Sequence, residues 1–158
     1  MRYFFVLIFF LLTLSILVWL TLDSNPTNEQ LNDGNCNKTN ESISKSHQQY
    51  LLKYGWDIKA KLSTCKRVVD YYPEFISTLQ SGGLNLEPYN QNGKEAVITT
   101  YTLKEKQLNG DKLSATIYEI DGTLVGGYGG LENWVPGVFS LDDKERLIKQ
   151  GVISNNSR

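Results

Sequence analysis

Histidine is almost absent from the sequence, and this restricts the chemistry that the chain can carry out. Among 158 residues the only histidine is His47. A Ser/His/Asp or Cys/His catalytic arrangement would have to use it, and a zinc site would lack its usual number of ligands. Glu119 and Asp121 could form an acid–base pair, but acids at strand ends are more often surface residues. We therefore expect no enzyme, no metal site and no cofactor.

An excess of positive charge is also missing. Lys and Arg number 16 against 17 Asp and Glu, which gives a formal net charge of −1. Such a balance provides no electrostatic footprint for nucleic acid. Lys59, Lys61, Lys66 and Arg67 form a small basic cluster, which we interpret as a solvated face because no Gly-rich loop precedes a helix nearby.

Cysteine is scarce as well, since Cys36 and Cys65 are the only two. On an oxidising side of a membrane they could form a disulfide. The alternative is a pair of unrelated thiols. The sequence favours this alternative, because Cys36 lies in a segment that we expect to be mobile.

One long apolar run is present at the N-terminus. Tyr3–Leu22 contains no charge, no Gly and no Pro, and as a helix it would reach about 30 Å, the thickness of a bilayer core. A cleaved signal peptide would need small residues at its end, whereas Leu22 is followed by Asp23. We predict a single-pass signal anchor at residues 1–22. Arg2 precedes the run and acidic residues follow it, so the N-terminus is expected in the cytoplasm and the rest outside.

The residues after the apolar run are polar. Residues 23–46 contain no aromatic side chain, and only Leu31 and Ile43 are aliphatic. Too little apolar surface is available to offset the entropy of ordering the chain, so we predict a disordered polar tether. Residues 47–151 then have the size of one domain, and residues 152–158 are expected to be frayed.

The first half of the domain shows helix signals on both sides of a weaker strand signal. Ser46 is a plausible N-cap for a short helix at His47–Tyr54. Two short strands are expected around a Ser63-Thr64 turn. A second helix should begin at Pro73 and stop at Gly82-Gly83, and Leu84–Tyr89 should form an edge strand or an ordered loop.

The strongest β signal lies in the second half. The signal consists of Glu95–Leu103, Lys112–Ile120 and Thr123–Tyr128. The first two runs alternate in polarity, and only Asp121-Gly122 separates the last two. This pair accepts the positive φ angles of a two-residue hairpin turn. We therefore predict an α+β fold: a small antiparallel β-meander packed against two or three short helices.

The C-terminal part contains a glycine cluster and a last helix. Gly126–Gly130 resembles a phosphate loop, but no helix follows it directly, so a strand end with bulges or close backbone contacts is favoured. Ser140 should cap a helix at Leu141–Lys149, with Asp143 completing a capping box and Gly151 closing the helix.

Aromatic side chains are the candidate contact residues, because aromatics dominate the energetics of interfaces. The binding candidates are Trp56, Tyr89, Tyr128 and Trp134. The alternative is that most of them belong to the core.

Several short motifs follow one another in a familiar order. They are Tyr50–Trp56, Pro73-Glu74-Phe75, Leu86–Tyr89 with Gly93-Lys94, Tyr101, and Asp121-Gly122 with Val125-Gly126-Gly127. In these motifs, over about residues 50–130, the chain resembles the domain of unknown function 4830 family. The resemblance implies an N-terminal membrane or lipoprotein signal before a small extracytoplasmic domain, mostly in spore-forming and related Gram-positive bacteria. It implies no activity and no catalytic residues.

The sequence as a whole favours a membrane-anchored extracytoplasmic domain with a non-catalytic binding role. The partners would be the membrane, through residues 3–22, and a protein or cell-wall component. One alternative is a structural or regulatory accessory subunit of a membrane complex that acts through its anchor. A small hydrolase is a third alternative, which the shortage of histidine disfavours.

Overall fold

The computed structural model describes residues 36–37 and 42–154. The predicted anchor, Tyr3–Leu22, and most of the predicted tether lie outside the described residues. Within the described residues, no helix is both long and apolar enough to cross a bilayer.

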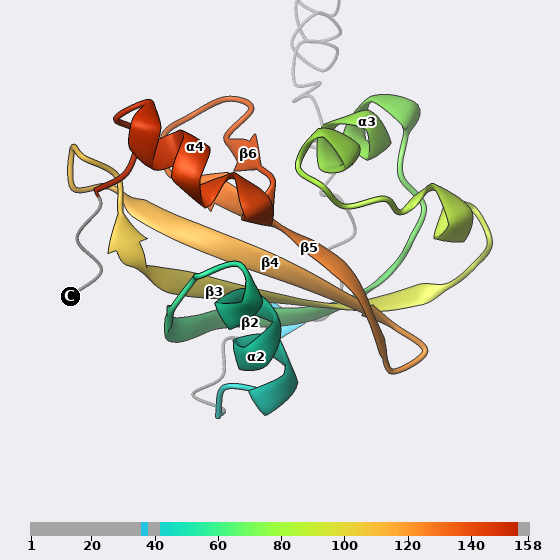
Figure 1. The fold of residues 1–158 in the computed structure, drawn as a ribbon. Coiled ribbons are helices and arrows are strands. Elements are labelled where there is room, and N and C mark those ends of the chain that lie inside the picture. The colour runs from blue at the N-terminus through green and yellow to red at the C-terminus, as the bar shows by residue number, and fades with distance from the viewer. Residues whose placement is uncertain (1–35, 38–41, 155–158) are drawn as a thin grey trace, which may run out of the picture. The chain divides into compact units, whose positions relative to one another are not determined.

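The described residues form one antiparallel sheet of six strands in the order β1-β2-β3-β4-β5-β6 (Figure 1). The strands are β1 at Cys36–Asn37, β2 at Ile58–Val68, β3 at Glu95–Lys106, β4 at Lys112–Ile120, β5 at Thr123–Leu131 and β6 at Val138–Phe139. Each strand pairs with the next one along the chain. The predicted meander is therefore confirmed, and β4 has the predicted bounds.

The β4–β5 hairpin turns at Asp121-Gly122, as predicted. Both residues have positive φ angles, 51° and 74°, which is the conformation that a two-residue turn of this kind requires. One step further, Glu119 pairs with Leu124 and Tyr118 pairs with Gly126, so Val125 is an extra residue at a bulge. The bulge therefore lies just before the glycine cluster, whose residues Gly126–Gly130 pair regularly inside β5; the expected close backbone contact is present at Gly127, where a Cβ would lie 2.6 Å from the Thr116 carbonyl oxygen.

The prediction of two short strands around a Ser63-Thr64 turn is wrong. Both residues lie inside the continuous strand β2, where Ser63 pairs with Thr100 and Thr64 with Thr99. The register shifts between Ile58 and Ala60 and again between Lys61 and Ser63. These two bulges interrupt the polar–apolar alternation, and the interruption resembles a turn in the sequence.

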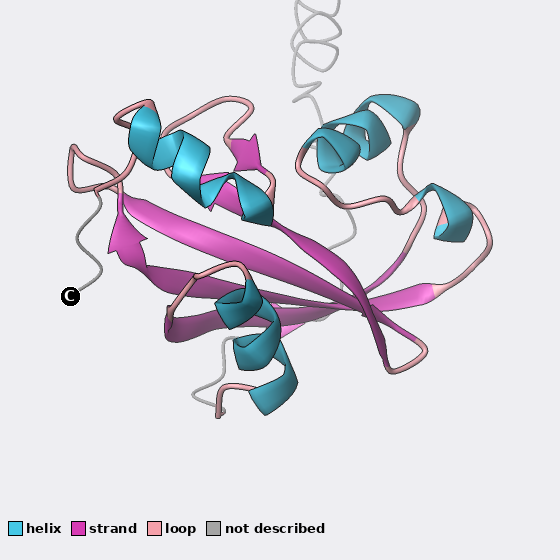
Figure 2. Cartoon of the chain, viewed as in Figure 1, coloured by secondary structure: helices cyan, strands magenta, loops and turns pink. Residues whose placement is uncertain are grey.

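Three α-helices and two short 3₁₀ helices accompany the sheet (Figure 2). They are α2 at Lys45–Lys53, α3 at Pro73–Ser81, η1 at Glu87–Tyr89, η2 at Leu141–Asp143 and α4 at Lys144–Lys149. Pro73 opens α3 and Gly83, at φ +85°, follows its end, so this helix is confirmed.

The ends of the other two α-helices differ from the expectations. α2 begins at Lys45 with Ser44, not Ser46, at the N-cap position. The last helix is a 3₁₀ turn followed by α4, and the Ser140 side chain makes no capping bond. The predicted capping box is therefore incomplete: the Ser140 half is absent, while the Asp143 carboxylate accepts bonds from the guanidinium of Arg146, at 2.6 and 2.9 Å, and the Ser140 backbone also lowers its pKa.

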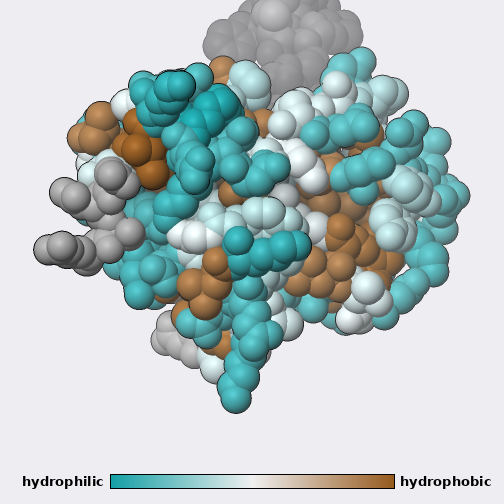
Figure 3. All heavy atoms as spheres, viewed as in Figure 1, coloured by the Kyte–Doolittle hydropathy of each residue, from teal (hydrophilic) through white to brown (hydrophobic). Residues whose placement is uncertain are grey.

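The two faces of the sheet bury separate apolar clusters. The first face packs against α2 and α4, and its buried residues include Leu51, Trp56, Tyr101, Ile117 and Leu147. The second face packs against α3 and the segment after it, and its buried residues include Ile76, Leu79, Leu84, Leu86, Ala96, Tyr118 and Ile120. In Figure 3 hydrophobic atoms gather between α3 and the β4–β5 hairpin, whereas hydrophilic side chains dominate over α2 and α4.

Leu84–Tyr89 forms no strand, so the ordered-loop reading of this segment is the correct one. Leu84 and Leu86 are both fully buried. The segment ends in η1, where Pro88 fits a helical turn.

Cys36 and Cys65 form a disulfide, so the interpretation as two unrelated thiols is wrong. The two residues are also direct partners across the β1–β2 pair. The backbone pairing brings their Cα atoms within 4.1 Å, which a window of sequence around either cysteine does not reveal. The tether prediction changes accordingly, because β1 and the first residues of α2 lie within residues 23–46.

Residues 152–154, which were expected to be frayed, are held by contacts with the domain. Ile153 is buried and forms an isolated bridge with Gln107. The Leu108 N–H donates to the Val152 carbonyl at 3.0 Å. Residues 155–158 lie outside the described part of the chain.

Candidate binding groove

The second face of the sheet is covered over only part of its length. Its residues form rows across the strands, and the row under the α3 side contains Cys65, Ile98, Tyr118 and Gly126. A Cβ atom on Gly126 would lie 2.8 Å from the Leu84 side chain, and one on Gly82 would lie 3.1 Å from Tyr128. The segment around α3 therefore packs directly on this half, which we call the covered half.

The other half of this face carries a groove of about 540 Å³. Its floor is the cross-strand row Ala60, Thr102, Ser114 and Gly130, one residue from each of β2 to β5. All four side chains are small, so the sheet is hollowed where its neighbours would otherwise project. No helix of the described residues covers this row, and we call it the open half.

A row of hydroxyl groups separates the two halves. It contains Ser63, Thr100, Thr116 and Tyr128. The hydroxyls of Thr100 and Thr116 lie 3.1 Å apart and hydrogen bond to each other. Burial raises the pKa of the Tyr128 phenol, while a hydrogen bond with Thr116 acts in the opposite direction. The neutral Tyr128 side chain thus lies between the apolar cluster of the second face and the groove.

The bulges in β2 supply one wall of the groove. Lys59 is the extra residue between Ile58 and Ala60, and Leu62 is the extra residue between Lys61 and Ser63. Both extra residues line the groove. Bulges bend a strand and redirect side chains, and they are common beside functional sites. Leu62 is 49% exposed although it is a large apolar side chain.

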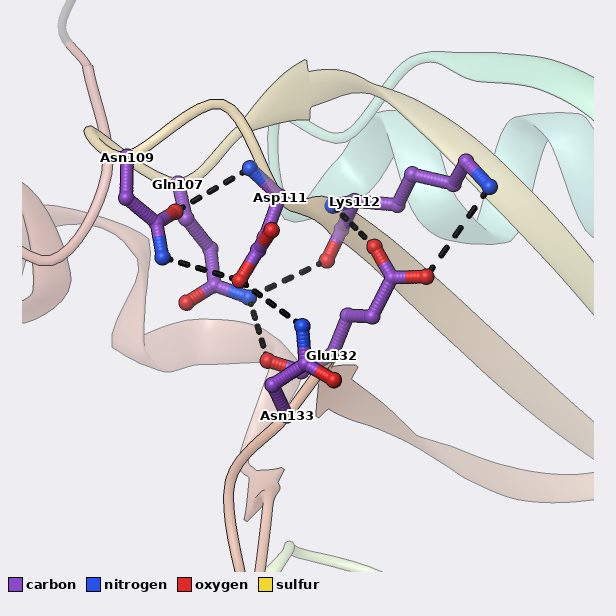
Figure 4. Close-up of polar contacts among 6 residues, drawn as sticks. All are labelled: Gln107, Asn109, Asp111, Lys112, Glu132 and Asn133. Atoms are coloured by element: carbon purple, nitrogen blue, oxygen red, sulfur yellow. Dashed lines mark hydrogen bonds and ion pairs between the residues drawn. The ribbon is translucent and has the colours of Figure 1, made fainter.

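A polar network holds the end of the groove where the β3–β4 loop meets the end of β5 (Figure 4). Gln107 is buried, and its side-chain amide donates to the carbonyls of Lys112 and Glu132 at 3.2 and 2.9 Å. The Glu132 carboxylate accepts from the Lys112 backbone N–H at 2.8 Å and lies 3.8 Å from its ammonium. The network fixes two loops that are far apart in the sequence.

The acidic residue of the β3–β4 loop belongs to the same network. Asp111 Oδ2 accepts from the side-chain amides of Asn109 and Asn133, at 2.8 and 3.1 Å. Figure 4 shows this carboxylate pointing toward the two amides. The hydrogen bonds of Asp111 therefore stabilise the β3–β4 loop and join it to the segment after β5.

Some charged side chains around the groove form ion pairs, and others do not. Glu105 forms an ion pair with Lys144, whose ammonium also lies 4.7 Å from the centre of the Trp56 ring. Glu132 pairs with Lys112. In the described part of the chain, by contrast, no acidic side chain forms an ion pair with Lys59 or Lys106. The unpaired charge on the β2–β3 side of the groove is therefore positive.

None of the four predicted aromatic contact residues lines this groove. Trp56 is fully buried, and its indole N–H donates to the Leu141 carbonyl at 2.7 Å. Tyr89 and Tyr128 pack against the apolar cluster of the second face. Trp134 is the exception, because it is 52% exposed in the loop before β6. The reading that most of the four belong to the core describes the structure better.

The acids that could have formed a catalytic pair have separate partners. Asp121 forms an ion pair with Lys94 at 2.6 Å. Glu119 lies 3.3 Å from Nε2 of His47, whose Nδ1 is 2.8 Å from the Tyr101 hydroxyl. His47 is only 3% exposed and lies on the first face, opposite the groove. Burial raises the pKa of the Tyr101 phenol, the Ser44 backbone lowers it, and the Glu119 charge raises it further.

No family model, no curated protein and no solved structure matches the chain. The resemblance to the domain of unknown function 4830 family therefore stays a prediction from the sequence motifs.

The groove was missed in the sequence because its residues are individually unremarkable. A weak signal exists in β3 and β4, which carry Thr102 and Ser114 on the open half and Ile98 and Tyr118 on the covered half. That signal can be read only when the strand register is known.

Proposed function

We propose that this protein is a non-catalytic binding module of the outer side of a membrane, held there by the segment Tyr3–Leu22 and a polar tether. The observation that carries the binding role is the groove on the open half of the second face. Its volume of about 540 Å³ lies within the usual range of ligand pockets, roughly 300–1,000 Å³. A preformed network holds its end wall, so binding would require little reorganisation.

The disulfide supports the proposed location. Disulfides persist in oxidising compartments and are rare where thiols are kept reduced. The Cys36–Cys65 bond therefore agrees with a domain that lies outside the cytoplasm.

The position of His47 supports a role without catalysis. The residue best suited to acid–base chemistry near neutral pH is buried on the first face and faces Tyr101 and Glu119. The groove is lined by hydroxyl, lysine, aliphatic and carboxylate side chains, and each of its carboxylates, Glu105, Asp111 and Glu132, already has a partner within the domain.

Photo-crosslinking from two matched positions tests the binding role. Leu62 lies in the groove and is 49% exposed, whereas Leu52 lies on α2 and is 47% exposed. A photoreactive residue is placed at either position in the full chain, in its own membrane. We expect a discrete crosslinked product from position 62 and none from position 52. Equal products would contradict a groove-specific role, and the absence of both would contradict binding.

The alternative role, an accessory subunit that acts through its anchor, is separated by an exchange of the anchor. Residues 1–22 are replaced with an unrelated membrane-spanning segment in the chain that carries the photoreactive group at position 62. A binding module keeps its crosslinked product after the exchange. Loss of the product from a correctly inserted protein would favour contact through the anchor.

A further inference from the structure

We infer that the groove binds a short, extended peptide segment that carries carboxylate groups. This inference rests on the proposed function, because it names the ligand of the same groove. Three observations support it: the unpaired lysines, the length of the floor and the apolar wall.

The lysines of the groove favour a negatively charged ligand. Lys59 on β2 and Lys106 on β3 both line the groove, and neither has an acidic partner among the described residues. Of the acids that line the same groove, Glu105 pairs with Lys144 and Glu132 with Lys112, while the Asp111 carboxylate accepts hydrogen bonds from the amides of Asn109 and Asn133. A carboxylate on the ligand would therefore meet cations without displacing an existing ion pair.

The floor of the groove sets the length of the peptide that can bind. The row from Ala60 through Thr102 and Ser114 to Gly130 crosses four neighbouring strands. With strands about 4.8 Å apart, three spacings amount to roughly 14 Å. An extended peptide advances about 3.3 Å per residue, so approximately four residues fit across the floor.

The apolar wall distinguishes a peptide from other anionic polymers. Leu62 lines the groove and is half exposed, so it offers apolar surface to a ligand. A polysaccharide or a polyol phosphate has no apolar side chain that gains from contact with Leu62. A peptide that carries both apolar and acidic residues can contact Leu62 and the lysines, and the hydroxyls of Thr102 and Ser114 can bond to its backbone.

The test uses the full-length protein in detergent and a labelled, end-capped peptide in which leucine and glutamate alternate. Its controls are the same peptide with glutamine in place of glutamate and a polyol phosphate of equal charge. We expect the acidic peptide to bind best, and to bind more weakly as salt is raised. Equal binding of the glutamine peptide would overturn the carboxylate assignment, and preference for the polyol phosphate would overturn the peptide assignment.

Substitutions locate the binding. Lys59→Gln and Lys106→Gln should each weaken binding of the acidic peptide by about 1.4- to fivefold, because an exposed charge pair contributes about 0.2–1 kcal/mol. Lys66→Gln, on the same strand but outside the groove, should leave binding unchanged. Ala60→Trp should fill the floor and abolish binding, and a normal melting temperature would exclude misfolding. Unchanged binding by Ala60→Trp would overturn the inference.

The binding role of the groove and the identity of its ligand can be tested separately. If Ala60→Trp removes the crosslinked product of position 62 but the acidic peptide does not bind, the groove is a binding site for another ligand. If position 62 gives no product, the binding role itself is wrong.

Discussion

The two faces of the sheet are covered to different extents, although the same strands form both. On the first face, α2 and α4 pack over Tyr101, Ala115 and Ile117, and these side chains are almost fully buried. On the second face, α3 covers one half, and the other half ends in Thr102, Ser114 and Gly130. In β3 and β4 the side chains differ with the covering: Tyr101 and Ile117 lie under helices on the first face and Ile98 and Tyr118 on the covered half, whereas Thr102 and Ser114 lie on the open half.

Alternation along a single strand shows this difference most clearly. Gly129 and Gly130 are neighbours in β5 and point to opposite faces. A Cβ atom on Gly129 would lie 2.1 Å from the Phe139 ring, whereas one on Gly130 would lie 2.6 Å from the Ser114 hydroxyl oxygen. The first neighbour is a packed ring, and the second is a hydroxyl that can rotate. The two glycines should therefore differ in how well they tolerate substitution by alanine, and the difference can be measured.

The largest effect is expected from the core of the covered first face. Trp56→Ala should lower the free energy of unfolding by about 3–5 kcal/mol, because a fully buried indole and its bond to the Leu141 carbonyl are lost. Urea titration measures the change. Trp134→Ala is the control, since this side chain is half exposed and its loss should cost less than about 1 kcal/mol. Similar losses from both substitutions would contradict the difference in burial.

The disulfide at the edge of the sheet should have the next largest effect. Replacement of both Cys36 and Cys65 by Ser should lower the free energy of unfolding by about 3 kcal/mol, as expected for a crosslink that spans 29 positions of the chain. The measurement is thermal unfolding of the double variant beside the oxidised and the reduced parent. A reduced parent that matches the oxidised one in stability would contradict the bond.

The paired glycines provide the most direct comparison of the two faces. Gly129→Ala should cost about 1–3 kcal/mol through overpacking against Phe139. Gly130→Ala should cost less than about 1 kcal/mol, because the Ser114 hydroxyl can turn away. Urea titration of the two variants side by side decides. The reverse order would mean that the second face is the more tightly packed.

The smallest effect is expected from Asp143, at the start of α4. Hydrogen bonds from Arg146 hold the pKa of the Asp143 carboxyl below its usual value, although partial burial acts in the opposite direction. A carboxyl whose pKa is lower in the folded state stabilises the fold above its unfolded pKa of about 4, and this contribution is lost as the pH falls further. Asp143→Asn should therefore flatten the pH dependence of the melting temperature slightly below about pH 4. An unchanged profile would show that the pair contributes nothing.

Local features of the sequence were sufficient for the central hairpin. Lys112–Ile117 alternates in polarity, and Asp121-Gly122 has the residue types for positive φ angles. α3 was equally accessible, because Pro73 and Gly82-Gly83 mark its ends. In these segments the local preference and the final structure agree.

Features that depend on pairing between distant segments could not be predicted. β2 was divided in two because the bulge at Leu62 interrupts its alternation, and only pairing with β3 shows that the strand continues. The disulfide requires β1 to lie against β2. The groove requires both the register of four strands and the knowledge that α3 stops before the row of Ala60. No window of neighbouring residues contains this information.

The Cys36–Cys65 bond also changes how the domain would respond to mechanical load. Tension applied from the N-terminal side would enter at Cys36 and pass through the disulfide to Cys65, in the interior of β2. The chain between the two cysteines, including α2, would then lie in a closed loop outside the line of force. A force applied at Cys36 would load the pairing of β2 with β3 and leave α2, the helix that holds His47, unloaded.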